Sequence, residues 1–553
     1  LQEVVDFLCA GSAAQAAVAF TPSAVFVPTE AAAKTTPVAR AAQLTRQVLR
    51  PTLFPPADTR PHITLAPGSL VWLTDDGTAL TAALVKNLEQ RGLTVRRGSP
   101  TELLADRNAP LPAALVLLAP ASPGGDAFLK SAFRLIQVAA PSLRAAGRSG
   151  AAVLVSLSRL DGLFGHGVMS PTADVVSGGL AGLVKTARHE WPEVHCKAID
   201  LDPGAASGTE LANQITEEIF RVGPIEVGLF GGQRYSLEIE TAPALDNPAP
   251  AIQRGDLVVV TGGARGVTAT SVLELARRHQ PRFLLLGRST LPDAEPHWLA
   301  GLTSEAEIKK ALLAHADGDR SPKKLEVKFR EVMAQREIRA HLAEIRATGA
   351  LAHYTTLDVR DAAAVTTTLA EVRTAHGPIR GFIHGAGVLA DKLIEQKTEE
   401  QFDLVYGTKV HGLRNLLAAT AQDELRLIAL FSSYTGRFGR TGQVDYAAAN
   451  EVLNKMAQAE ARRRPQCRVV AFNWGPWNGG MVNDGLRKIF EREGVGLIEP
   501  DAGADCFVRD VLAPTGEAVE ILALAAAPVI RPIRPTSPNF HPAFDRDVSV
   551  RAL

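Results

Sequence analysis

A tyrosine, a serine and an asparagine at defined spacing are the residues of this sequence best suited to chemistry. Tyr446 and Asn450 are four positions apart, on one face of a helix, and Ser433 ends an apolar run thirteen residues before Tyr446. Carbonyl reduction needs a proton donor for the oxygen that becomes negative as hydride arrives, and a second donor that holds this oxygen. Tyr446 and Ser433 fit these two roles. The alternative for Tyr446 is a buried side chain that is hydrogen-bonded for packing alone.

A cation is also needed, because a tyrosine with its ordinary pKa of about 10 is a poor acid at neutral pH. The position four residues after Tyr446 holds Asn450 and not a lysine. Lys409, on the preceding helical segment, is our candidate for the cation that lowers the pKa of Tyr446. The alternative is an ordinary surface lysine. We expect Asn450 to position Lys409 or a proton-relay water.

A glycine-rich turn is the candidate site for the hydride-carrying dinucleotide. Residues 257–268 read Leu-Val-Val-Val-Thr-Gly-Gly-Ala-Arg-Gly-Val-Thr, an apolar strand that leads into a turn and a helix over 271–278. Glycines let the backbone approach a pyrophosphate, and the helix N-terminus offers free N–H groups. Thr268 stands where a third glycine is usual, and an ordinary tight turn is the alternative. The candidate contacts of this turn are Thr261, Gly262, Gly263, Arg265, Gly266 and Val267.

Later strand ends supply further candidate contacts to the cofactor. Arg288 lies where the ribose of a dinucleotide would be, and an arginine there accommodates a 2′-phosphate, which favours NADPH over NADH. A solvated cation is the alternative for Arg288. Asp358 is placed to hold the adenine edge, and residues 385–387 to pass close to the nicotinamide ribose. The candidates at these strand ends are Arg288, Ser289, Asp358, Val359, His384, Gly385, Ala386 and Gly387, with Lys409 and Tyr446 as further cofactor contacts.

Parallel strands that end at one edge would bring these residues together, and the hydrophobic pattern predicts such strands. Apolar runs alternate with helical stretches from about residue 63, and the rhythm restarts after Asp256, which indicates βαβ units in an α/β fold. Prolines at 244, 248 and 250 separate two halves. We expect a linker over 1–62, a first half over 63–245, a second half over 246–535 with a helical insertion at about 291–350, and a linker over 536–553.

The two halves look like a distant internal repeat. Residues 155–165 can be laid over residues 429–439, so that Gly162, Phe164 and Gly165 match Gly436, Phe438 and Gly439. The residues with chemistry are present in the second half and missing from the first. Two similar folds with unequal chemistry are therefore expected.

Composition excludes several classes of protein. The 553 residues contain 59 Lys+Arg and 59 Asp+Glu, so no strong net charge favours a nucleic acid or an anionic membrane as partner. The four cysteines lie far apart without a CxxC pair, which fits neither a metal site nor a disulfide framework and indicates a reducing cytoplasm. No apolar run approaches the roughly 20 residues of a membrane span. Leu1 is an unusual start, so we expect a piece of a longer polypeptide.

Taken together, these motifs resemble the ketoreductase domains of modular polyketide synthases and related megasynthases, in the short-chain dehydrogenase/reductase superfamily. The resemblance covers about 63–530 and is strongest over 255–480. The lysine and the asparagine are exchanged relative to the common Tyr-x-x-x-Lys reductases, which is a trait of this family. Thr268 and the long insertion look most like the ketoreductase of bacterial polyunsaturated fatty-acid synthases. The motifs that carry the resemblance are Thr261-Gly-Gly-Ala-Arg-Gly, Leu286-Gly-Arg-Ser, His384-Gly-Ala-Gly-Val, Lys409, Ser433, Tyr446 and Asn450.

The resemblance implies NADPH-dependent reduction of a 3-ketoacyl thioester, presented on the phosphopantetheine arm of an acyl carrier protein, to the 3-hydroxyacyl thioester. It also implies two Rossmann-like halves with parallel sheets, the first degenerate and structural and the second catalytic. The sequence agrees, since Thr74-Asp-Asp-Gly77 replaces the glycine-rich turn and Arg159 aligns with Ser433.

The same resemblance bears on stereochemistry. Leu389-Ala-Asp391 partly matches the Leu-Asp-Asp signature of ketoreductases that form the 3R alcohol, and no Trp lies between Ser433 and Tyr446. Asp391, Trp474 and Trp477 are then candidates for substrate contact and stereocontrol. Trp474 and Trp477 are alternatively core or rim aromatics.

The ends of the chain imply neighbouring synthase domains as partners. Residues 1–8 resemble the last helix of an acyl carrier protein, and residues 548–553 resemble a segment leading into a dehydratase domain. One alternative function is a catalytically silent scaffold of a synthase, which predicts a broken set of site residues. Another is a free-standing reductase of small carbonyl substrates, which the degenerate first half disfavours.

Overall fold

Short apolar runs in both halves of the chain form the strands of one sheet. The computed structural model describes residues 44–525 except 56–58, 106–109, 205–207, 246–249, 293, 317–319, 481, 483 and 494. The linkers and domain-like ends expected within 1–43 and 526–553 lie outside the described residues. Within these ranges the strands follow the order β11-β10-β9-β12-β13-β14-β15-β1-β8-β7-β6-β5-β4-β2-β3.

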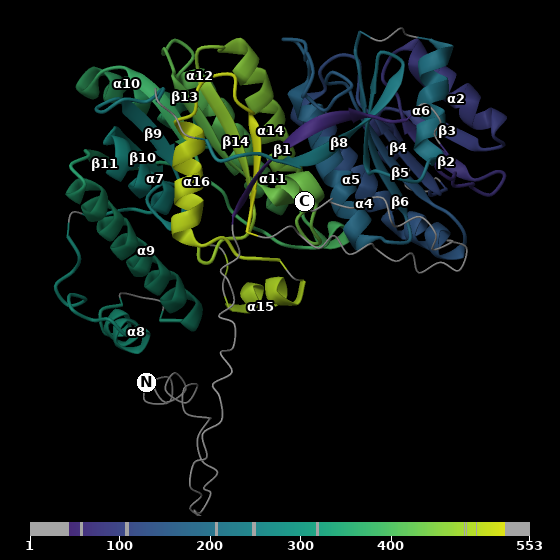
Figure 1. Ribbon diagram of the computed structural model, residues 1–553. Helices are drawn as coiled ribbons and strands as arrows, with labels where there is room; N and C mark the ends of the chain where they lie inside the picture. The colour runs from purple at the N-terminus through teal and green to yellow at the C-terminus, as the bar shows by residue number, and fades with distance from the viewer. Residues whose placement is uncertain are drawn as a thin grey trace, which may run out of the picture.

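The second half of the chain is a parallel sheet with helices on both faces, as Figure 1 shows on its left side. Its strands other than the edge strand β11 are almost wholly buried, which is the reason for their continuous apolar runs. The strands are β9 (Leu257–Thr261), β10 (Arg282–Gly287), β11 (Ala352–Thr356), β12 (Ile379–His384), β13 (Leu427–Ser433), β14 (Arg468–Trp474) and β15 (Glu520–Leu524). The helices that cover them are α7 (Gly266–His279), α10 (Ala362–His376), α11 (Glu399–Tyr406), η3 (Gly407–His411), α12 (Gly412–Ala419), α13 (Tyr434–Phe438), α14 (Val444–Arg463), α15 (Asp484–Glu493) and α16 (Pro500–Val511).

The first half repeats this topology for six of the seven strands. Its order β3-β2-β4-β5-β6-β7 corresponds to β10-β9-β12-β13-β14-β15, and β11 has no counterpart among the described residues. Both halves are Rossmann-like, as the sequence predicted. The strands are β2 (Leu70–Thr74), β3 (Thr94–Gly98), β4 (Ala114–Leu118), β5 (Val153–Ser158), β6 (His195–Leu201), β7 (Glu226–Phe230) and β8 (Gln233–Thr241). The helices are α2 (Ala79–Gln90), α3 (Pro100–Ala105), α4 (Gly125–Ser149), η1 (Val175–Gly178), α5 (Gly179–Glu190) and α6 (Thr209–Phe220).

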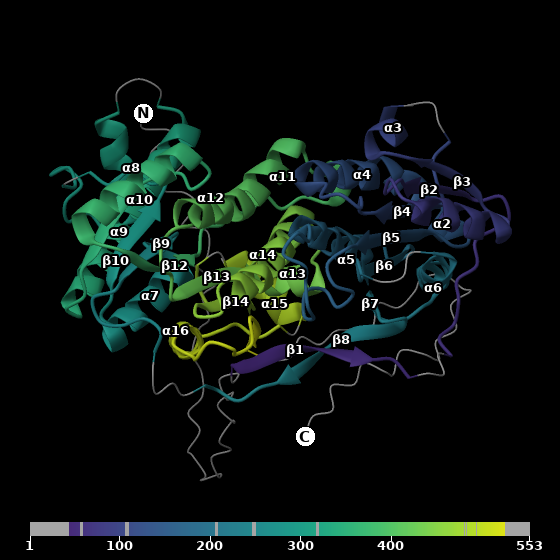
Figure 2. The same ribbon diagram turned by 90° about the horizontal axis from the view of Figure 1, so that it is seen from above.

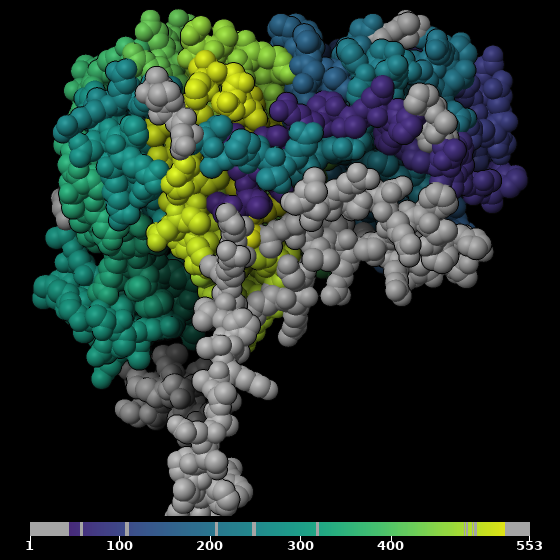
Figure 3. Space-filling model, in the orientation of Figure 1, coloured from purple at the N-terminus to yellow at the C-terminus, as the bar shows by residue number. Residues whose placement is uncertain are grey.

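Strand β1 (Thr45–Leu53) joins the two halves into one sheet. It pairs antiparallel with β15 on one side and with β8 on the other, and in Figure 3 its purple residues extend from the yellow part of the second half into the first half. The linker expected over 1–62 is therefore wrong for residues 45–53. The sequence misled because the buried positions of β1 include Arg46, which is neutralised by Asp510 at 3.0 Å (Nε to Oδ1).

Helices α5 and α14 form the main helical contact between the halves, and Figure 2 shows them side by side. A Cβ atom on Gly182 of α5 would lie 2.6 Å from the backbone of Ala447 and Ala448 in α14, so only glycine fits there. Buried charges cross the same contact. Lys185 of α5 bonds Glu226 at 2.9 Å and also pairs with Glu451 of α14.

The insertion between β10 and β11 is helical, as the sequence predicted. It contains α8 (Glu305–Ala314) and α9 (Pro322–Ala347) and has a small core of its own around Leu299, Ile308, Leu312 and Val332. Helix α9 packs against α7 and β11, at the lower left of Figure 1. Across the described parts of the chain, no helix is both long and apolar enough to cross a membrane.

Candidate active site

Ser433, Tyr446 and Asn450 meet at the carboxyl end of β13. Ser433 is the last residue of β13 and caps α13 by accepting a hydrogen bond from the N–H of Thr435 at 3.2 Å. The side chains of Ser433 and Asn450 lie close enough to the Tyr446 hydroxyl to lower its pKa. Asn450 Nδ2 also donates to the carbonyl of Tyr446 at 2.8 Å, one helical turn away. The four-residue spacing therefore brings these side chains together as the sequence predicted.

Lys409 reaches the same place from a π-helical turn, η3, between α11 and α12. Its Nζ lies 5.2 Å from the centre of the Tyr446 ring and donates to the carbonyl of Phe431 at 2.8 Å. Lys409 is buried, and burial lowers its pKa to about 7. Single π-turns inside helices occur often at functional sites, and this one turns Lys409 inward and away from the surface.

The expected lowering of the Tyr446 pKa is wrong for this structure. Burial raises the pKa of Tyr446 to about 12, against the hydrogen bonds from Asn450 and Ser433, which lower it. The ammonium group of Lys409 faces the ring and the Phe431 carbonyl, and its effect on the Tyr446 hydroxyl stays a prediction. Burial disfavours the charged form of both groups, so it moves the two pKa values in opposite directions.

His384 lies behind Lys409 and is fully buried. Its Nδ1 lies 2.8 Å from Thr261 Oγ1, and its Nε2 lies 2.9 Å from the carbonyl of Lys409. These partners indicate that Nε2 donates and Nδ1 accepts, and burial lowers the pKa of His384 to about 3. The expected contact of His384 with a cofactor stays a prediction, although both of its ring nitrogens are used inside the protein. The imidazole connects the glycine-rich turn to the backbone that carries Lys409.

The turn after β9 has the close backbone approach that a dinucleotide pyrophosphate requires. Gly262 has φ +70°, and a Cβ there would lie 2.9 Å from the N of Ala386. A Cβ on Gly385 would lie 2.4 Å from Oγ1 of Thr268. Thr268 is therefore tolerated in place of the usual third glycine because the facing residue is itself a glycine.

The N-terminus of α7 already accommodates a negative oxygen. The N–H of Gly266 donates to Oε1 of Glu337, from α9 of the insertion, at 3.0 Å. A carboxylate at a helix N-terminus is favoured by the helix dipole and by the free N–H groups, as a phosphate would be. The residues of this turn thus fit the pyrophosphate of a dinucleotide, with Glu337 as a stand-in for its charge. The sequence offered no signal for Glu337, because it lies 71 positions from Gly266.

The other predicted cofactor contacts lie along the same edge of the sheet. Arg288 is exposed at the end of β10, and the carbonyl of Ser289 accepts from the hydroxyl of Tyr354 at 2.7 Å. Asp358 is held by Arg360, with Nη2 to Oδ2 at 2.6 Å, which lowers the pKa of the Asp358 carboxyl. Arg288 therefore presents an exposed cation, whereas Asp358 is already engaged by Arg360.

Of the three candidates for substrate contact, one lies at the site. Asp391 is exposed, and its Oδ2 accepts from Nε2 of Gln443 at 3.0 Å, three residues before Tyr446. Trp474 and Trp477 are buried and pack in an aromatic cluster, where Trp474 stacks on Phe472 with ring centres 4.8 Å apart. Their burial favours the alternative interpretation as core aromatics, and their assignment to substrate contact stays a prediction.

Sequence reasoning missed a buried ion pair beside the site. Lys397 Nζ lies 2.7 Å from Oδ2 of Asp445 and donates to the carbonyl of Ala390 at 2.9 Å. Asp445 directly precedes Tyr446, and Ala390 directly precedes Asp391. The pair thus connects the start of α14 to the loop that carries Asp391, and the adjacency of Asp445 to Tyr446 was its one sequence signal.

The first half carries an ion pair where the second half has its site. Arg159, directly after β5, donates from Nε to the carbonyl of Ala119 at 3.1 Å and pairs with Asp76. Arg159 thus occupies the position that Ser433 has in the second half. Asp76 lies in the turn after β2, which corresponds to the glycine-rich turn after β9.

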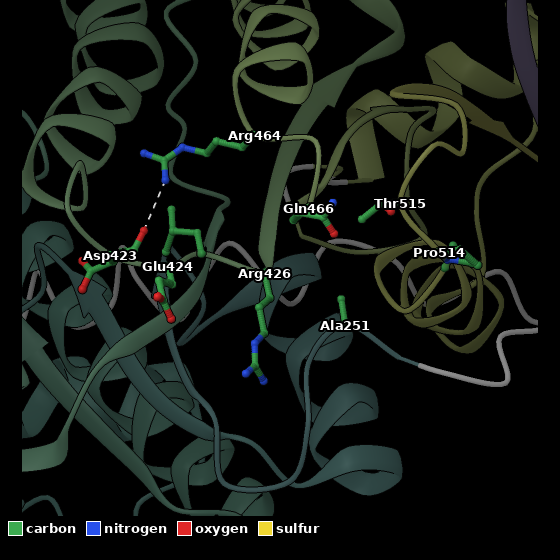
Figure 4. A pocket seen from close by; sticks show the side chains of 10 residues that line it. Ala251, Asp423, Glu424, Arg426, Arg464, Gln466, Pro514 and Thr515 are labelled. Atoms are coloured by element: carbon green, nitrogen blue, oxygen red, sulfur yellow. Dashed lines mark hydrogen bonds between the residues drawn. The ribbon is translucent and has the colours of Figure 1, made fainter.

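A surface pocket at the opposite edge of the sheet is separate from this site. It is lined by residues at the amino ends of β13 and β14 and from the segment after α16, and Arg464 donates there to the carbonyl of Asp423 at 3.3 Å (Figure 4). Open α/β sheets bind ligands at the carboxyl ends of their strands, where Ser433 lies. In the described ranges, no three His, Cys, Asp or Glu side chains are grouped to hold a metal ion.

Sequence comparison gives a family for the second half. Residues 257–479 match the family model described as the KR domain. One subunit of the polyunsaturated fatty acid synthase of Thraustochytrium sp. is 34% identical over 400 residues, which cover 68% of this chain and 14% of that protein. The polyketide synthase PksL of Bacillus subtilis is 28% identical over 336 residues, which cover 59% of this chain and 6% of that protein. The chain thus spans a small part of these relatives.

Solved structures show the same fold. The ketoreductase PlmKR1, from the first module of phoslactomycin biosynthesis in Streptomyces sp. HK803, matches with a TM-score of 0.65 and 20% identity, over 90% of this chain and 97% of that one. A ketoreductase domain from the bacillaene assembly line matches with a TM-score of 0.61 and 20% identity, over 87% of this chain and 97% of that one. Both halves of the present chain are thus included in the likeness.

We predict that Lys409→Met raises the free energy of unfolding by about 1–3 kcal/mol at pH 6. Burial lowers the pKa of Lys409 from 10.5 to about 7. The buried ammonium therefore destabilises the fold fully below pH 7, and the penalty shrinks as the pH rises from 7 towards 10.5. Urea unfolding should show a larger gain at pH 6 than at pH 9. Lys409→Arg, which keeps the charge, should show no gain, and an equal gain for Lys409→Met at both pH values would contradict the prediction.

Proposed function

We propose that this chain, which belongs to the KR-domain family, reduces a 3-ketoacyl thioester to the 3-hydroxyacyl thioester with NADPH. The observation that carries the proposal is the grouping of Ser433, Tyr446 and Asn450, with Lys409 Nζ 5.2 Å from the centre of the Tyr446 ring. This set lies at the carboxyl edge of the sheet, next to a turn that accommodates a negative oxygen. A silent scaffold would need none of these four side chains in contact.

In the proposed mechanism each of the four side chains acts on the carbonyl oxygen or on Tyr446. NADPH, when bound, supplies the hydride for C3 of the ketoacyl chain. Ser433 donates a hydrogen bond to the carbonyl oxygen, and Tyr446 gives this oxygen its proton, so that the alkoxide becomes an alcohol. Protonated Lys409 stabilises the tyrosinate that remains. Asn450 Oδ1, which has no hydrogen-bond partner among the described residues, is available to position Lys409 or a relay water.

The opposed pKa shifts of Tyr446 and Lys409 support this division of roles. With its pKa raised to about 12, Tyr446 keeps its proton until negative charge develops on the substrate oxygen. With its pKa lowered to about 7, Lys409 changes charge near neutral pH. The protonated lysine thus stabilises the tyrosinate more strongly than the neutral tyrosine, which is how an interaction accelerates a reaction.

The partners and the product follow from the family. We propose that the ketoacyl chain arrives on an acyl carrier protein, that further synthase domains adjoin the chain, with a dehydratase downstream, and that the reaction takes place in the cytoplasm. The names of the relatives, which are a polyketide synthase and part of a polyunsaturated fatty acid synthase, support this assignment. Asp391 beside Gln443 supports the 3R alcohol as the product. The first half, with Arg159 paired to Asp76, would be structural.

Tyr446→Phe should reduce kcat by about 10²- to 10⁴-fold, because the variant lacks the acidic hydroxyl. NADPH oxidation with a 3-ketoacyl thioester measures the rate, and NADPH fluorescence measures binding, which should stay within about twofold. Tyr235→Phe, on β8 of the first half, is the matched control and should keep the wild-type rate. A Tyr446→Phe enzyme with undiminished turnover would exclude Tyr446 as the proton donor. A wild-type protein that binds NADPH but never oxidises it with carrier-bound substrate would exclude the proposed reaction.

Arg288→Ala should weaken NADPH binding about tenfold and leave NADH binding unchanged, because only NADPH carries the 2′-phosphate. Dissociation constants for both cofactors from fluorescence titrations test this expectation. Arg282→Ala, at the other end of β10, removes a positive charge from the same strand and should change neither constant. An equal loss of affinity for both cofactors would assign Arg288 to a general electrostatic role.

Glu337→Gln should tighten the binding of NADPH and NADH alike, by about two- to tenfold, because the pyrophosphate then no longer displaces a carboxylate from the N-terminus of α7. Glu344→Gln, an exposed residue on the same helix, removes the same charge without this contact and serves as the control. Unchanged or weaker binding in Glu337→Gln would show that Glu337 does not compete with the cofactor.

A further inference from the structure

Glu190, in the half of the chain without site residues, bonds two loops of the active site. It is the last residue of α5. Its Oε2 accepts the N–H of Ile394 at 2.8 Å, and its Oε1 accepts the N–H of Gly442 at 2.8 Å. Ile394 and Gly442 lie 48 positions apart in the sequence, so one carboxylate joins two separate segments of the second half.

Both segments carry residues of the proposed substrate site or its immediate neighbours. Ile394 lies three residues after Asp391, and Gly442 directly precedes Gln443 in the segment that leads to Tyr446. The segments also bond each other, since the N–H of Lys392 donates to the carbonyl of Gly442 at 2.9 Å and Gln443 Nε2 donates to Asp391 at 3.0 Å. Glu190 thus holds together the loop of Asp391 and the approach to the tyrosine.

A second residue of the first half supports the same loop. Gln137 of α4 donates from Nε2 to the carbonyls of Ile394 at 2.8 Å and Lys397 at 2.7 Å. Lys397 in turn pairs with Asp445, the residue before Tyr446. The loop of Asp391 is therefore held by Glu190, Gln137 and Arg144 of the first half and by Asp445 of α14.

The position of Glu190 is unfavourable for an ionised carboxylate unless its two hydrogen bonds compensate. A carboxylate at the C-terminus of a helix is disfavoured by the helix dipole. Burial raises the pKa of Glu190, against the N–H groups of Ile394 and Gly442, which lower it. Lys397 is the nearby cation that also favours the carboxylate, and Glu395 opposes it. The two backbone bonds are the contacts that offset these costs, because a charged acceptor strengthens each of them.

We infer that Glu190 is a positioning residue that sets the Asp391 loop against the Gln443–Tyr446 segment and so controls which face of the ketone is reduced. The inference rests on the proposed ketoreduction. Both segments border the substrate, so a relative shift between them changes the orientation of the carbonyl to the hydride. A displacement of about 1 Å in such a contact can change rates about 100-fold. The glycine-rich turn follows another strand, β9, so the binding of NADPH should not change.

The experiment compares Glu190→Ala with wild type by kcat, the 3R to 3S ratio of the product, and the dissociation constant of NADPH. We expect a fall in kcat of about tenfold or more and a rise in the minor enantiomer of at least about fivefold, with NADPH binding within about twofold. Glu190→Gln keeps one carbonyl oxygen as acceptor. Its kcat and product ratio should lie between those of wild type and Glu190→Ala. Glu218→Gln is the matched control, because Glu218 is buried in the first half and pairs with Arg60, Lys197 and Arg234.

A Glu190→Ala protein that keeps the wild-type product ratio would overturn the inference. So would an equal change of that ratio in Glu218→Gln, because the effect would then reflect a weakened first half.

Hydrogen exchange separates this inference from the proposed function. The amides of Ile394 and Gly442 should exchange about tenfold faster in Glu190→Ala and at the wild-type rate in Glu218→Gln. Unchanged exchange at both amides in Glu190→Ala would show that Glu190 holds neither loop, whatever the enzyme reduces. If exchange rises but wild type binds NADPH without reducing any ketoacyl thioester, the proposed reaction fails, and with it the control of its stereochemistry.

Discussion

The close contact between α5 and α14 is the constraint on which the site depends. Helix α14 carries Tyr446 and Asn450, and its backbone lies so near Gly182 that no side chain fits between the helices. The same contact buries Lys185, Glu226, Glu451, Lys455 and Glu520. Removing a charge from water costs several kcal/mol unless a partner compensates, so each of these groups requires the others in place. The arrangement of α14 is therefore specified by the half of the chain that lacks site residues.

Burial opposes ionisation both in this helix contact and in the site, but its effect on the pKa values differs between the two places. Although burial opposes ionisation, Lys185 and Lys455 lower the pKa of Glu451, while burial lowers the pKa of Lys185 to about 7. In the site, burial lowers the pKa of Lys409 and raises that of Tyr446, because neither has an opposite charge in contact. Charged pairs hold the halves together, whereas the uncompensated groups are those that change protonation in the proposed reaction. This separation lets the fold be stable while the site remains reactive.

The first half has a positive role beyond burial of a surface. Its site position holds an Arg159–Asp76 ion pair, and Arg159 also donates to the carbonyl of Ala119. Its sheet continues into the second through β1, and its helices α4 and α5 supply Gln137 and Glu190 to the loop of Asp391. The half without the site residues thus contacts the loop beside the site in the other half.

The sequence by itself determined the elements and the site residues whose positions follow from local spacing. The glycine-rich turn after an apolar strand and the i, i+4 pair of Tyr446 and Asn450 depend on backbone geometry within a few residues. Both Rossmann-like halves were likewise readable from alternating apolar runs. Tertiary structure decided everything that depends on burial. It placed β1 in the sheet through the Arg46–Asp510 pair, and turned His384, Trp474 and Trp477 into the core. It also raised the pKa of Tyr446 and brought Glu190 and Glu337 to the site, since contacts between residues far apart in the chain leave no local pattern.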